Sequence, residues 1–168
     1  ESLATLSKRY DLHQVTRIAL VGEIFVRRDD FSRQSLVEKL ADNGILVRTA
    51  PVTEWLHYTD YCIGSGLNGP VSLKRKLAVS LKKAVMRKDE RIIFRHLAAS
   101  GFHDGHPVDM NHLMSKGAAL LNPALTGEAI LTISSAITEI GDENHGVISI
   151  GPFGCMPCRI AESILTYR

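Results

Sequence analysis

The stretch RIALVGEI, residues 17–24, is a compact run of mostly apolar residues, which is typical of a strand buried on both faces. A helical pattern follows over residues 36–41, and an asparagine–glycine pair ends it. We expect Asp30 or Ser32 to cap this helix. A second apolar run covers residues 45–50. This order of strand, helix and strand predicts a right-handed crossover between two parallel strands.

A third strand is predicted near the end of the chain, at residues 145–151 (HGVISIG). We expect the first strand to lie at the centre of the sheet, between the other two. Helices are predicted between the second and third strands, at residues 52–61, 71–88, 90–100, 108–121 and 126–140, with a glycine-rich loop at 63–70. The β-branched residues of 126–140 would also suit a strand, but its length and its spacing of isoleucines favour a helix.

These elements together predict an α/β fold with three layers, a small, mostly parallel sheet and a helical insertion. The α/β domain covers residues 17–168, its helical segment covers 52–140, and residues 1–16 form a lead-in helix. A length of 168 residues suits one domain. Because the chain begins with Glu1 and its last helical pattern continues to Arg168, we expect it to be a piece of a longer protein.

Composition excludes several classes of protein. The net charge is +2 and 23% of residues are charged, so the overall charge does not indicate a nucleic-acid partner. No apolar run approaches the roughly 20 residues of a membrane span. Three cysteines cannot form a disulfide scaffold, and nothing indicates export, so we expect a cytoplasmic protein with reduced thiols.

The turn GPFGCMPC, residues 151–158, is the most informative motif, and we call it the cysteine turn. It follows a predicted strand and opens a helix, where unpaired N–H groups and the helix dipole favour thiolates at Cys155 and Cys158. Such a pair suits three chemistries: iron–sulfur cluster ligation, dithiol–disulfide exchange and zinc binding. Zinc is the weakest of these, because only Cys62 and histidines remain as further ligands. The plain alternative is a pair of inert, buried cysteines.

Glu23 and Arg27 follow the first strand. Ligands of open α/β sheets bind beyond the carboxyl ends of the strands, so Glu23 is predicted to face a cleft and Arg27 to hold a phosphate or carboxylate. The alternative is a charged, solvated turn.

Eight basic residues lie between residues 74 and 91. They would suit CoA phosphates, an acidic partner or nucleic acid. Because aromatic residues are not interleaved with these charges, a solvated helix face is favoured over nucleic-acid binding.

Three blocks of the sequence carry a resemblance to a known family: RIALVGEIFVRRDDFS (17–32), EWLHY (54–58) and HGVISIGPFGCMP (145–157). They resemble the CoA-substrate-specific enzyme activases. Within those long proteins, they are similar to the portion that resembles the cluster-binding subunits of 2-hydroxyacyl-CoA dehydratases.

This resemblance implies a Rossmann-like domain with a role in ATP-driven, low-potential electron transfer to a dehydratase-type iron–sulfur centre. Cys155, with Cys158, would be an iron ligand, and Glu23 and Arg27 would border the cleft. The implied partners are other domains of the parent chain, including an ATPase module, and an acyl-CoA substrate or a dehydratase subunit.

The ATPase module itself is not recognisable, since the chain has no G-x-x-x-x-G-K-[ST] motif. We therefore do not expect the isolated chain to be catalytic, and it would hold at most one cluster or none. Two other functions stay open: a non-catalytic interaction domain with inert cysteines, and a dithiol oxidoreductase that uses Cys155 and Cys158.

Overall fold

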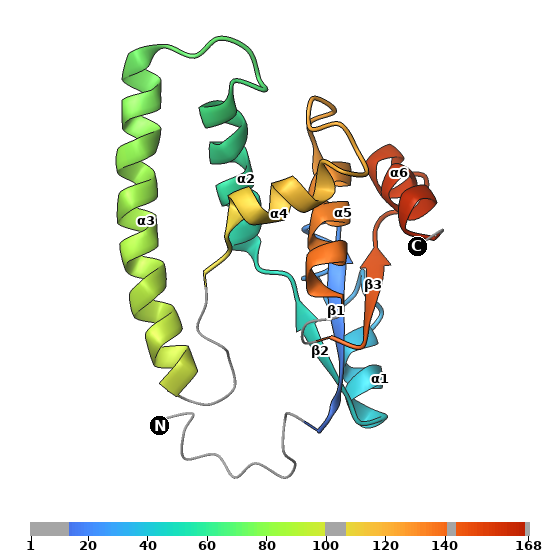
Figure 1. Ribbon diagram of the computed structural model, residues 1–168. Helices are drawn as coiled ribbons and strands as arrows, with labels where there is room; N and C mark the ends of the chain where they lie inside the picture. The colour runs from blue at the N-terminus through green and yellow to red at the C-terminus, as the bar shows by residue number, and fades with distance from the viewer. Residues whose placement is uncertain (1–13, 100–106, 141–143, 167–168) are drawn as a thin grey trace.

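The computed structural model describes residues 14–99, 107–140 and 144–166 (Figure 1). Residues 1–13 of the predicted lead-in helix lie outside the described residues, and its last predicted residue, Thr16, instead begins the first strand. The elements in chain order are β1 (Thr16–Gly22), α1 (Leu36–Asp42), β2 (Ile45–Thr49), α2 (Val52–Ser65), α3 (Leu73–Ala99), α4 (Met110–Gly117), α5 (Glu128–Glu139), β3 (Gly146–Ile150) and α6 (Met156–Leu165).

The three strands form one parallel sheet in the order β2-β1-β3. This confirms the predicted central place of the first strand. In the register of the sheet, Ile18 of β1 lies opposite Val47 of β2 and Gly146 of β3. The middle of β1, residues 19–21, is almost completely buried, because both neighbouring strands and α5 cover it. An uninterrupted apolar run is what such a position requires.

The start of α1 differs from the prediction. Ser35 occupies the N-cap position in a left-handed conformation and makes no capping hydrogen bond through its side chain. Asp29 instead closes the turn before the helix, where its Oδ2 accepts hydrogen bonds from the backbone N–H and the hydroxyl of Ser32. Neither Asp30 nor Ser32 is therefore the cap, because the turn places both of them several residues before the first helical turn.

The prediction of a helix at 126–140 is confirmed, and this helix, α5, is the central helix of the fold. It packs against β1, β3, α4 and α6, and every residue from Ala129 to Ala136 is buried. Although α5 belongs to the segment 52–140, it covers the sheet directly (Figure 1). Its β-branched residues fill the space between the strands and the other helices.

A helical core lies beside the sheet, where α2, α4 and α5 meet. Its buried residues are Tyr58, Cys62, Met110, Leu113, Met114, Ile130 and Leu131. The helix α2 continues to Ser65, beyond the predicted end, and Gly66 closes it in a left-handed conformation. The helix α4 is shorter than predicted. Its N-cap residue is Asp109, whose side chain accepts hydrogen bonds from two backbone N–H groups of the first turn.

The long helix α3 corrects the prediction of two separate helices, one ending at residue 88 and one starting at 90. It is one helix of 27 residues, since neither glycine nor proline interrupts it. It lies alongside α2 (Figure 1). Polar contacts hold the two helices together: His57 Nε2 lies 2.7 Å from Glu90 Oε1, and Lys82 Nζ lies 2.8 Å from Asp60 Oδ1.

Within the described part of the chain, none of the helices combines the length and the apolar character that crossing a bilayer requires.

Candidate functional site at the carboxyl ends of β1 and β3

The chain leaves β1 toward β2 on one side and later returns to β3 on the other side. The carboxyl ends of β1 and β3 therefore form a topological switch point, which is where open α/β sheets bind ligands. The backbone N–H of Glu23 donates a hydrogen bond of 2.9 Å to the carbonyl of Ile150. Gly22 has a φ of 111°, and a Cβ there would overlap the backbone of Ile150. The close approach of the two strand ends thus depends on a glycine.

The two cysteines of the predicted motif lie at this switch point but in different surroundings. Cys155 is the N-cap residue of α6 and is half-buried. Cys158 lies one turn further along and is buried. A Cβ at Gly151 would overlap the Sγ of Cys158, so the buried thiol packs against the backbone at the end of β3. The motif therefore contains one half-buried and one buried cysteine.

The expectation of a thiolate at Cys158 is wrong. The pKa of Cys158 is raised to about 12, mainly by burial and next by the neighbouring Cys155 side chain. The negative charges of Glu128 and Glu23 act in the same direction. Burial and the two nearby carboxylates outweigh the effect of the helix N-terminus, because both disfavour a negative charge on the Cys158 sulfur. At neutral pH, Cys158 is therefore a neutral thiol.

Glu23 lies directly after β1, and its carboxylate accepts a hydrogen bond from its own loop. Its Oε2 accepts a hydrogen bond of 2.7 Å from the backbone N–H of Val26. Its Cβ lies next to Gly151, on the side of the switch point where Cys158 packs. Glu23 thus links the loop after β1 to the cysteine turn.

Glu128 is a residue of this site that the sequence analysis missed. It begins α5 and accepts a hydrogen bond from the backbone of Ile24. Burial raises the pKa of Glu128, and the charge of Glu23 raises it further. Glu128 lies more than 100 positions from Glu23 in the sequence. The sequence Thr-Gly-Glu at the start of the predicted helix 126–140 could have indicated Glu128, because this helix leads to the third strand.

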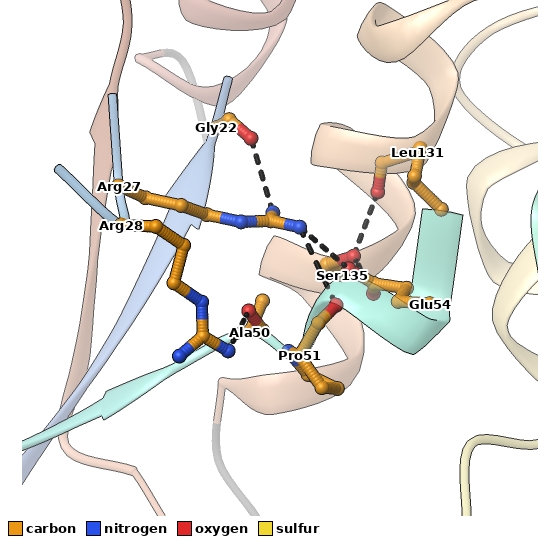
Figure 2. A network of polar contacts seen from close by, with 8 residues as sticks. All are labelled: Gly22, Arg27, Arg28, Ala50, Pro51, Glu54, Leu131 and Ser135. Carbon is orange, nitrogen blue, oxygen red and sulfur yellow. Dashed lines mark hydrogen bonds and ion pairs between the residues drawn. The ribbon is translucent and has the colours of Figure 1, made fainter. Parts of the chain in front are cut away.

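Arg27 is buried beneath the site. Figure 2 shows its guanidinium group between the end of β1 and the start of α2. Nη1 donates a hydrogen bond of 3.0 Å to the carbonyl of Gly22, and Nη2 lies 3.5 Å from the carbonyl of Pro51. Nη2 also lies 3.6 Å from Oε2 of Glu54. Arg27 does hold a carboxylate, and that carboxylate belongs to the protein itself.

Glu54 and Ser135 complete this buried network, and the sequence analysis assigned no role to either. The hydroxyl of Ser135 lies within hydrogen-bonding distance of two acceptors, Oε1 of Glu54 and the carbonyl of Leu131 (Figure 2). Burial raises the pKa of Glu54, while Ser135 and Arg27 lower it by less. Burial also lowers the pKa of Arg27. The network joins the loop after β1, α2 and α5, and so fixes the elements that surround the site.

Cys62 lies in the helical core with Tyr58 and Leu113, separate from the cysteine turn. Among residues 14–99, 107–140 and 144–166, no three His, Cys, Asp or Glu side chains are grouped so that they could hold a metal ion. Iron–sulfur clusters are usually held by four thiolates. Cys155 is half-buried, whereas Cys158 is buried against Gly151, and three cysteines in the sequence are fewer than the four that a cluster usually takes. The chain alone therefore does not fit a complete cluster.

The surface around Cys155 is apolar and open. Phe153 is 98% exposed and Met156 is 71% exposed, and the guanidinium carbon of Arg159 lies 5.8 Å from the centre of the Phe153 ring. Exposed large apolar side chains beside a half-buried cysteine are typical of a contact surface.

No protein-family model, curated protein or solved structure matches this chain.

Proposed function

We propose that this chain is an electron-transfer domain of an activase-like protein, which docks against a 2-hydroxyacyl-CoA dehydratase-type iron–sulfur centre. In this proposal the fold is a three-layer, Rossmann-like domain, because right-handed crossovers would place α1 and α5 on opposite faces of the sheet. An ATPase module of the parent protein and an acyl-CoA-binding dehydratase subunit would be its partners, in the cytoplasm.

The observation that carries the proposal is the position of Cys155. Cys155 is half-buried and occupies the N-cap position of α6 at the switch point of the sheet, and the exposed side chains of Phe153 and Met156 lie close to it in the sequence. The resemblance of residues 17–32 and 145–157 to the activase family adds support. Since Cys158 is buried and neutral, Cys155 would supply one iron ligand and the partner would supply the others.

Reconstitution with iron and sulfide under anaerobic conditions tests this role. The reconstitution includes a 2-hydroxyacyl-CoA dehydratase subunit, because the partner would supply the other iron ligands. We expect the wild-type chain to add iron and visible absorbance beyond those of the subunit alone, and Cys155→Ser to lose both gains. Cys62→Ala is the matched control, because Cys62 lies in the helical core, and it should retain as much iron as the wild type. Equal iron with wild type and Cys155→Ser, or no added iron with either, would reject Cys155 as a ligand.

A specific observation favours a second function, dithiol oxidoreductase. Cys155 is the half-buried thiol, Cys158 is the buried one, and the two side chains interact directly. In thiol–disulfide exchange, the Cys155 thiolate would attack a substrate disulfide and release the first substrate thiol. Cys158 would then lose its proton, attack the mixed disulfide and release the second thiol, leaving a Cys155–Cys158 disulfide.

This alternative predicts different behaviour of the Cys158→Ser variant. Without the second thiol, the mixed disulfide between Cys155 and a model substrate such as oxidised glutathione would accumulate. The wild type would instead form an internal disulfide that reduced glutathione reverses. If neither species forms over a range of glutathione potentials, the oxidoreductase function is excluded.

A further inference from the structure

The outer face of α3 has no partner within the described chain and carries a regular stripe of exposed side chains. We define the α3 stripe as Leu77, Leu81, Val85, Lys88, Ile92 and Arg95, all of which are exposed. After the first step of four, the spacings alternate between four and three residues, which is the seam of a helix that pairs with another helix.

The exposure of this stripe is large. Leu77 is 74% exposed, Leu81 is 68% exposed and Val85 is 55% exposed. Glu90, which contacts α2 through His57, lies about half a turn around the helix from Leu81 and Lys88. The contact with α2 therefore uses the opposite face, and it leaves the stripe free.

Charge identifies the kind of partner. The stripe contains two cations, Lys88 and Arg95, and no acidic residue. The whole of α3 carries nine Lys and Arg residues against only Asp89 and Glu90, so two copies of this helix would repel each other in either orientation. We propose that the α3 stripe binds an amphipathic helix of a partner protein, with apolar residues along its seam and Asp or Glu opposite Lys88 and Arg95. This inference is independent of the function proposed for the cysteine turn.

Two other surfaces with negative charge fit the stripe less well. A helix that lies on an anionic membrane presents a continuous apolar face with its cations along the edges, whereas Lys88 and Arg95 interrupt the stripe itself. Nucleic acid would engage the cations through its phosphates, but it offers no apolar seam for Leu77, Leu81 and Val85.

Binding of designed helical peptides to the complete chain tests the inference. One peptide carries leucine at the seam positions and glutamate beside them, and the matched peptide carries lysine in place of glutamate. We expect only the acidic peptide to bind. Leu81→Gln and Lys88→Gln should each weaken its affinity by about tenfold or more, while the off-stripe controls Ile93→Gln and Arg75→Gln should leave it unchanged. All four side chains are exposed, so circular dichroism should show folded variants.

Several results would overturn the inference. These are no binding of the acidic peptide, equal binding of both peptides, or an equal loss of affinity in stripe and off-stripe variants. Vesicles of phosphatidylcholine with phosphatidylserine test the membrane: binding that Leu81→Gln abolishes would assign the stripe to a lipid surface. Sedimentation tests self-association: a dimer that Leu81→Gln dissociates would assign the stripe to a second copy.

Discussion

The guanidinium group of Arg27 lies 3.6 Å from the carboxylate of Glu54, and both side chains are almost fully buried. The pair connects the loop after β1 with the first turn of α2, and Ser135 on α5 holds the same carboxylate. Charges that are removed from water are tolerated only when they are paired and hydrogen-bonded. The arrangement of the elements around the site therefore depends on this pair.

Removal of one member of the pair should be strongly destabilising. Arg27→Met leaves the Glu54 carboxylate buried without its cation, and we expect a loss of about 3–5 kcal/mol in the free energy of unfolding. Urea denaturation measures it. The double variant Arg27→Met, Glu54→Leu should lose less than the sum of the two single variants. Strict additivity would show that the two side chains do not interact.

The protonation of Glu54 should make stability depend on pH. Because burial raises its pKa above the ordinary value of 4.5, the folded protein binds this proton more tightly than the unfolded chain does. The contribution of Glu54 to stability is then fully present below its ordinary pKa and is lost as the pH rises through the folded-state pKa.

The variant Glu54→Gln cannot titrate at this position. The difference in free energy of unfolding, wild type minus Glu54→Gln, should therefore decrease as the pH is raised from about 4 to 7. Urea denaturation of both proteins across that range measures this difference. A difference that stays constant or increases with pH would contradict the direction of the pKa shift.

The two thiols of the cysteine turn should react at different rates. With its pKa raised to about 12, Cys158 has only about one thiolate in ten thousand molecules at pH 8, and it is also buried. Iodoacetamide should therefore modify Cys155 first, and Cys158 only after unfolding. Mass spectrometry of the modified peptides follows both sites. If Cys155 reacts as slowly as Cys158, the cysteines are inert and the interaction-domain alternative is favoured.

The contact between α4 and α5 should tolerate no side chain at Gly117. A Cβ there would overlap the Oγ of Ser134, which is buried on α5. Although alanine is a better helix former than glycine, we expect Gly117→Ala to destabilise the protein by about 1–3 kcal/mol through overpacking. Thermal or urea unfolding measures the effect.

The matched control for this contact is the double variant Gly117→Ala, Ser134→Ala. It removes the overlapping oxygen, so it should recover part of the lost stability. If Gly117→Ala alone stabilises the chain, the two helices are not in close contact at this point.

Much of the fold could be predicted from local patterns. The three apolar runs became the strands of one parallel sheet, and the spacing of isoleucines correctly favoured a helix for α5. The division of α3 was wrong because Asp89 and Glu90 are not helix breakers and nothing else interrupts that segment. The stripe of α3 also shows that an apolar pattern predicts a helix face without showing what covers it.

The candidate site was predicted only in part. The order of the strands indicated that Glu23 and the cysteine turn lie at one edge of the sheet, and the structure places them there. The roles of Glu128, Glu54 and Ser135 could not be predicted, because each depends on a contact with a residue far away in the sequence. Two neighbouring cysteines in one turn likewise gave no indication that one would be half-buried and the other buried.

The sequence by itself determined the strands, the central place of β1 and the position of Cys155 at the end of a strand, because apolar periodicity and chain connectivity are local properties. Only the tertiary structure decided that Cys158 is a neutral thiol and that Arg27 binds the protein's own Glu54. Burial and the distance between charges set the ionisation of these groups, and both arise only when distant segments pack together.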